Sequence, residues 1–139
     1  MSFMKLLLVS AMVGALFHFR NEFDTKFALR TADVSSNGFI ALPAPTDLDA
    51  DTVIVFAAEN CPKEDGQRAD RLADELSRHN VPHTRAHSAN FDLPEPDPAV
   101  LNRLDSVMKG SLPIVFVNGR GKANPTFEEV LSEYNNSTK

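Results

Sequence analysis

One continuous run of apolar, largely β-branched residues, Thr52–Ala58 (TVIVFAA), constrains the fold of this chain more than any other feature. Such a run is typical of a strand that is buried on both faces of a sheet. A turn follows, and then Pro62, which suits the first position of a helix because its missing N–H would be unpaired there anyway. Apolar residues then recur at helical spacing as far as Asn80. The sequence therefore predicts a strand–turn–helix unit over residues 52–80.

The rest of the chain carries the signals of further strands and helices in a regular order. Asp97-Pro98 suits the cap and first position of a helix, and Gly110 suits the position just past its end. Asn118-Gly119 is a strong hairpin signal, and Thr126-x-x-Glu129 is a capping box that opens the last helix. The expected elements are strands at 83–88, 114–117 and 120–123 and helices at 98–109 and 127–134. This β-α-β-α-β-β-α order predicts an α/β fold with a parallel crossover followed by a hairpin.

The first thirty residues have the character of a targeting segment. Lys5 precedes Leu6–Phe19, a run without Asp, Glu, Lys or Arg, which matches the charged and apolar regions of a signal peptide. Counted from Met1, the run approaches the roughly 20 residues that a membrane-spanning helix needs. A cleaved signal, a short membrane anchor and a buried helix of a cytosolic protein all stay open. We expect an exported or membrane-anchored protein, on the periplasmic side if the source is bacterial.

Composition changes after this segment. Phe19, Phe23 and Phe27 form a helical stripe, and Thr31–Thr46 is then rich in Ser, Gly, Ala and Pro. We interpret the latter as a linker or extended lead-in rather than a packed element. The expected division is a signal peptide or anchor helix at 1–30, a linker at 31–50, the α/β domain at 51–135 and a polar tail at 136–139.

Charge and composition exclude several classes of function. The net charge is −5 and no basic stripe is present, which argues against a nucleic-acid surface. The single cysteine, Cys61, excludes an intramolecular disulfide. The four histidines are scattered, so we expect no metal site; His83 and His87, about 13 Å apart along a strand, cannot share one ion.

Two local motifs, together with the element order, resemble the glutaredoxin branch of the thioredoxin-like family. The first is strand–turn–Cys61-Pro62-Lys63-Glu64–helix, where dithiol glutaredoxins carry Cys-Pro-x-Cys. The second is the stretch from Leu112-Pro113 to Asn118-Gly119, where the family places a cis-proline before a strand that ends in an Asn-Gly turn. The resemblance covers about residues 51–135. It implies a groove beside Cys61 and Pro113.

The departures from the family pattern fall on its chemistry. Glu64 stands where the second cysteine would be, so the dithiol pair is absent. The lysine that usually precedes the cysteine and holds glutathione's carboxylate is also absent. Ala123-Asn124-Pro125-Thr126 replaces the Gly-Gly and Asp that hold the other end of glutathione. We therefore expect no cofactor, with glutathione poorly supported.

Cys61 has two interpretations. A helix N-terminus and Lys63 favour the thiolate, which is the reactive form, whereas Glu59, Glu64 and Asp65 disfavour it. Without a resolving cysteine, a mixed disulfide there is released only by an outside thiol. The residue is either a reactive thiol or a structural remnant.

Two hypotheses about function follow. In the first, the domain is a binding or scaffold module without dithiol activity, and Pro62, Leu112 and Pro113 help hold a protein or peptide partner in the groove. In the second, it is a monothiol thiol–disulfide oxidoreductase that uses Cys61 as its catalytic residue. Membrane contact is expected only through the N-terminal segment.

Overall fold

The computed structural model describes residues 34–58, 63–93, 95 and 97–136. The chain divides into Met1–Ala32 and Asp33–Lys139, and every described residue belongs to the second unit. The predictions made for residues 1–30 therefore lie outside the described residues. Among the residues that are described, no helix is long and apolar enough to cross a membrane.

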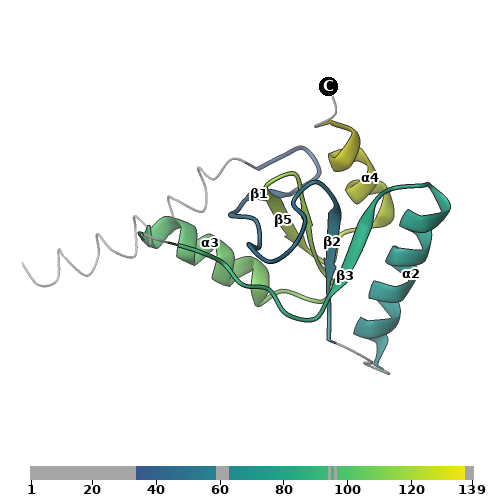
Figure 1. Ribbon diagram of the computed structural model, residues 1–139, viewed down its shortest axis with the longest axis horizontal. Helices are drawn as coiled ribbons and strands as arrows, with labels where there is room; N and C mark the ends of the chain where they lie inside the picture. The colour runs from purple at the N-terminus through teal and green to yellow at the C-terminus, as the bar shows by residue number, and fades with distance from the viewer. Residues whose placement is uncertain (1–33, 59–62, 94, 96, 137–139) are drawn as a thin grey trace, which may run out of the picture. The chain divides into compact units, whose positions relative to one another are not determined.

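A five-stranded sheet with three helices makes up the described unit (Figure 1). The strands are β1 (Ile40–Ala41), β2 (Val53–Phe56), β3 (His83–Ala86), β4 (Ile114–Val117) and β5 (Arg120–Ala123), and the helices are α2 (Glu64–Arg78), α3 (Pro98–Met108) and α4 (Phe127–Asn136). The strand order is β1-β5-β4-β2-β3, so β2 and β4 lie side by side in the interior of the sheet. β2 runs parallel to β3 across α2, and β4 and β5 form the predicted hairpin.

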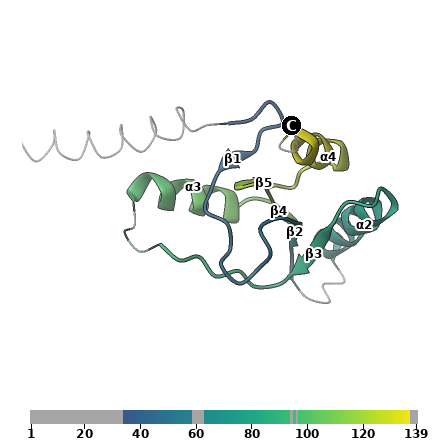
Figure 2. The ribbon, with the colours of Figure 1, turned by 45° about the horizontal axis from the view of Figure 1, so that its top comes forward.

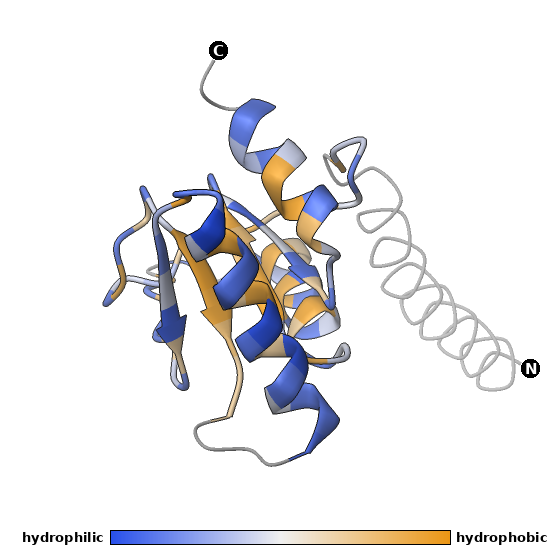
Figure 3. Cartoon of the chain, turned by 90° about the vertical axis from the view of Figure 1, so that its right-hand side faces the viewer, coloured by the Kyte–Doolittle hydropathy of each residue, from blue (hydrophilic) through white to orange (hydrophobic). Residues whose placement is uncertain are grey.

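The two faces of the sheet are covered by different helices (Figure 2). Val53 and Val55 of β2 point to the face that carries α2 and α4, where Leu76 is fully buried. Ile54, with its cross-strand partner Phe116, points to the opposite face, against α3. Alternate residues of one strand thus enter two cores, which is why β2 and β4 have no polar side. Figure 3 shows apolar residues along the strands in the middle of the sheet, whereas the helices carry hydrophilic as well as apolar segments.

Residues 34–42 correct the prediction of an unpacked linker. Phe39 is 0% exposed in the core beneath α2 and α4, and Leu42 is buried on the α3 side. The chain folds back at Gly38, whose φ of 81° an L side chain rarely adopts. β1 then pairs with β5 as an edge strand. Ser, Gly and Pro in this segment form turns between packed residues rather than a flexible spacer.

A polar network ties the same segment to α4 and β5. The carboxylate of Glu133, which is 3% exposed, accepts a hydrogen bond of 3.0 Å from the Asn37 side chain. Nε of Arg120 lies 3.7 Å from the other Glu133 oxygen. Nζ of Lys122 donates to the Asn37 carbonyl oxygen at 2.9 Å. The buried charge is therefore paired, as a buried carboxylate must be.

The helix ends follow the sequence signals closely. Asn80, with a φ of 54°, closes α2, and the Val81 N–H donates to the Leu76 carbonyl. The Asp97 side chain accepts from the Ala99 N–H at the start of α3. Gly110 does follow α3, but it is not among the residues of positive φ. A Cβ at Gly110 would lie 2.3 Å from the Cβ of Ala123, so close packing on β5 is the reason for glycine there.

Candidate functional site

The groove expected beside Pro113 corresponds to an open cavity of about 340 Å³. It lies between α2 and the connection from β5 to α4, where β4 begins. The Leu112–Pro113 bond is cis, as the resemblance implies, and Pro113 is part of the wall. The lining is completed by four residues of α2, three of the connection and the first residue of α4: Arg68, Arg71, Leu72, Glu75, Asn124, Pro125, Thr126 and Phe127. A volume of this size falls in the range of small-molecule and peptide side-chain sites.

The backbone of Leu112 is partly occupied by a side chain of the protein itself. Nε and Nη2 of Arg68 donate to the Leu112 carbonyl oxygen at 3.2 and 3.0 Å. The binding role expected for Leu112 assumes that its backbone N–H and carbonyl are both free for a partner strand, and for the carbonyl this assumption is wrong. Within the described part of the chain, the Leu112 N–H donates to no acceptor. The Leu112 carbonyl oxygen is therefore already bonded within the protein.

The same arginine is held by acids of its own helix. Its Nη2 pairs with the Asp65 carboxylate in a short contact, and its Nη1 lies 3.6 Å from Oε1 of Glu64. Glu64 and Arg68 are four residues apart, so the sequence alone indicates an i,i+4 pair on the outer face of the helix. The structure adds that the arginine also bridges α2 to the entry of β4. Sequence reasoning missed this role, since helix periodicity alone does not show which backbone group an outer-face arginine reaches.

Polar groups at the start of α4 form hydrogen bonds with one another. The Thr126 N–H donates to Oε2 of Glu129 at 2.9 Å, and the Glu129 N–H donates to the Thr126 hydroxyl at 3.2 Å. This confirms the predicted capping box. Nζ of Lys122 lies 2.9 Å from Oε1 of Glu129, and this hydrogen bond, followed by that of the Thr126 N–H, lowers the pKa of Glu129 below its ordinary value. The start of α4 is thus already occupied by a carboxylate.

Cys61 and Pro62 lie outside the described residues, so their place relative to Pro113 stays a prediction. Two polar side chains of β3 have structural partners. Arg85 pairs with Asp70 of α2 at 3.0 Å, and the His83 ring contacts the Ser77 hydroxyl and the Val81 carbonyl. These contacts join β3 to α2. Across residues 34–58, 63–93, 95 and 97–136, no group of three or more His, Cys, Asp or Glu side chains could hold a metal ion.

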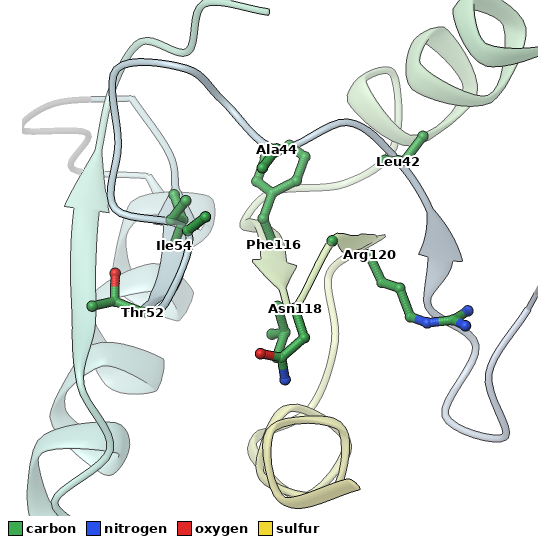
Figure 4. Close-up of a pocket in the computed structure, with 10 residues that line it drawn as sticks. Leu42, Ala44, Thr52, Ile54, Phe116, Asn118 and Arg120 are labelled. Atoms are coloured by element: carbon green, nitrogen blue, oxygen red, sulfur yellow. The ribbon is translucent and has the colours of Figure 1, made fainter. Parts of the chain in front are cut away.

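A second cavity lies at the other end of the sheet (Figure 4). It sits where β2 begins and β4 ends, with Ile54, Phe116 and Ala44 around it. Its volume is about 10 Å³, which is roughly the space of a single water molecule. The Arg120 side chain is directed away from Ile54 and Phe116. This cavity is a packing gap and not a ligand site.

No family model, curated protein or solved structure matches the chain.

Proposed function

We propose that residues 51–135 form a divergent glutaredoxin-like domain of the thioredoxin fold that binds an extended protein segment and lacks dithiol activity. The support for the fold is the sequence resemblance, together with strand pairings that fit the expected element order. The observation that carries the function is the open cavity of about 340 Å³ with Pro113 in its wall. A site of this size, lined by apolar side chains together with charged and polar ones, has room for a side chain of a bound peptide.

Two further observations favour binding over catalysis. The chain has a single cysteine, so no internal dithiol–disulfide cycle can run. The start of α4, where the family holds one end of glutathione, is capped by Glu129. A carboxylate of glutathione placed there would meet a like charge, which disfavours the complex.

Peptide titration of the full chain tests the binding proposal. The probe is an acetylated and amidated pentapeptide, Ala-Leu-Gln-Ala-Ala, added to ¹⁵N-labelled protein. We expect the amide signals of Ile114, Asn124 and Phe127 to move together, whereas that of Ser106 on α3 stays in place. Shifts that are absent at millimolar peptide, or that are scattered over both faces of the sheet, would refute a groove beside Pro113.

The alternative enzyme hypothesis has its own test. A monothiol oxidoreductase would show glutathione-dependent reduction of a disulfide substrate that disappears in Cys61→Ser. We expect no such turnover, because the second cysteine and the glutathione contacts are missing. Robust activity that depends on Cys61 would replace the binding proposal with the redox one.

We also propose that the N-terminal segment directs the protein to a membrane or across it. The support is the uncharged run Leu6–Phe19 behind Lys5. Fusing residues 1–32 to a reporter that is active only outside the cytosol should give signal. A silent reporter beside an active cytosolic fusion would overturn this localisation.

A further inference from the structure

One face of α2 forms a wall of the cavity beside Pro113. Arg68, Arg71, Leu72 and Glu75 follow one another at spacings of three, one and three residues, so they share that face of the helix. Three of the four are charged. Some of these charged groups already form ion pairs or hydrogen bonds within the protein and others do not. This difference decides which ligand charge the cavity can bind.

Two of these three charges have partners. Arg68 is bound to the Leu112 carbonyl and to Asp65. Oε1 of Glu75 lies 3.3 Å from Nη1 of Arg78, one turn further along the helix. Arg71 is exposed and makes no hydrogen bond or ion pair among residues 34–58, 63–93, 95 and 97–136. Its guanidinium is the one charge of the described lining that remains available to a ligand.

The opposite wall decides what else the ligand must carry. It is built from Pro113, Pro125 and Phe127, with Leu72 completing the apolar surface. The start of α4 does not compete for an anion, because the Glu129 carboxylate already accepts from the Thr126 N–H. Arg71 is therefore the cation of the described lining that is available to an anion, and a small free anion beside it would leave the apolar wall uncovered.

We infer that the cavity selects an acidic peptide segment, in which a carboxylate pairs with Arg71 and a neighbouring apolar side chain lies against Pro125 and Phe127. The inference rests on the proposed function, since it names the chemistry of the segment bound in the same groove. A guanidinium suits this role because its fork of N–H donors matches the two oxygens of a carboxylate.

A double-mutant cycle between protein and peptide tests the selectivity. The peptides are capped Ala-Leu-Glu-Ala-Ala and its Gln twin, and the proteins are the full-length wild type and Arg71→Gln. We expect Arg71→Gln to weaken the Glu peptide about 2- to 5-fold, the range of an exposed ion pair, and to leave the Gln peptide unchanged. The wild-type preference for the Glu peptide should also shrink as salt is added.

Controls separate charge at the site from charge in general. Lys109→Gln removes the same charge just past the end of α3, away from the cavity, and should leave the preference intact. Arg71→Lys keeps the positive charge and should retain part of the preference for the Glu peptide. Acetate at the peptide concentration should not displace the Glu peptide; displacement would show a site for free carboxylates and overturn the peptide assignment.

The outcomes distinguish this inference from the function on which it rests. If both peptides bind the wild type and Arg71→Gln equally well, the groove binds peptides and the acidic preference is wrong. If neither peptide moves the amide signals of the cavity, the proposed function itself fails. An equal loss of the Glu preference in Lys109→Gln would assign it to net charge and also overturn the inference.

Discussion

Phe39→Ala is the substitution that most directly tests whether residues 34–42 belong to the folded unit. The Phe39 side chain is 0% exposed and packs in the core with Leu76 and Val130 of the two helices on that face. Replacing a fully buried phenylalanine by alanine costs about 3–5 kcal/mol. Unfolding free energies of domains lie at about 5–15 kcal/mol, so the loss would be a large fraction of the total. Urea denaturation of the full chain, followed by circular dichroism, measures it.

The control for this prediction lies five residues earlier. Val34 is 49% exposed, and Val34→Ala should change the unfolding free energy by no more than about 0.5 kcal/mol. The dependence on urea should keep its slope in both variants if each unfolds in one step. A loss below about 1 kcal/mol for Phe39→Ala at unchanged slope would refute the packing described for this segment and restore the linker interpretation.

Three further predictions concern the core, a close contact and an ion pair. Leu76→Ala should cost about 2–5 kcal/mol in urea denaturation, because Leu76 is fully buried; a loss under 1 kcal/mol would mean that α2 packs by another face. Gly110→Ala should cost about 1–3 kcal/mol through its clash with Ala123, and Ala123→Gly in the same chain should recover most of that loss. Since Lys122 and the Thr126 N–H lower the Glu129 pKa, their stabilisation is complete above the ordinary value of 4.5 and disappears as pH falls through the folded-state pKa. Glu129→Gln should therefore be less stable at neutral pH and lose less stability on acidification, and an acid limb identical to that of the wild type would contradict this.

The elements with strong local signals could be predicted from the sequence. β2 and β4 can be recognised in the sequence as short apolar runs, because both of their faces are buried. The helix caps at Asp97 and Thr126 are also visible, since each needs only residues a few positions apart. In these elements the sequence pattern and the tertiary environment make the same demand. That agreement is why the order of strands and helices within 52–136 was predicted correctly.

The prediction for the segment around Phe39 was wrong for the opposite reason. Its strand has two residues, too few to show a period, and its turn residues resemble those of a linker. A usable signal was present, because Asn37-Gly38 followed by Phe39-Ile40 has the form of a hairpin turn before an apolar run. Its burial, however, depends on β5 and α4, which lie about 80 to 95 residues further along the chain. Contacts of this range leave no local pattern.

Only part of the candidate site could be found from the sequence. Leu112-Pro113 could be found because it precedes a recognisable strand, and Cys61 because it precedes a recognisable helix. Arg71 was not found, because an arginine on the polar side of a helix is an ordinary surface residue in the sequence. Arg71 becomes a candidate binding residue only because the β5–α4 connection lines the same cavity, and the geometry of that connection is set by tertiary packing.

The two arginines on this face of α2 should differ in what they do for the protein, and this can be measured without any ligand. Arg68 donates two hydrogen bonds to the Leu112 carbonyl, 44 residues away, whereas Arg71 has no partner in the described part of the chain. Arg68→Ala leaves a partly buried carbonyl without its donor, which costs about 1–3 kcal/mol of unfolding free energy. Arg71→Ala removes an exposed side chain and should stay within about 0.5 kcal/mol. Both variants lose one positive charge and one long side chain from the same helix, so each is the control for the other. Equal losses in urea denaturation would mean that the contact with Leu112 contributes nothing, and the distinction between a structural arginine and an available one would have to be given up.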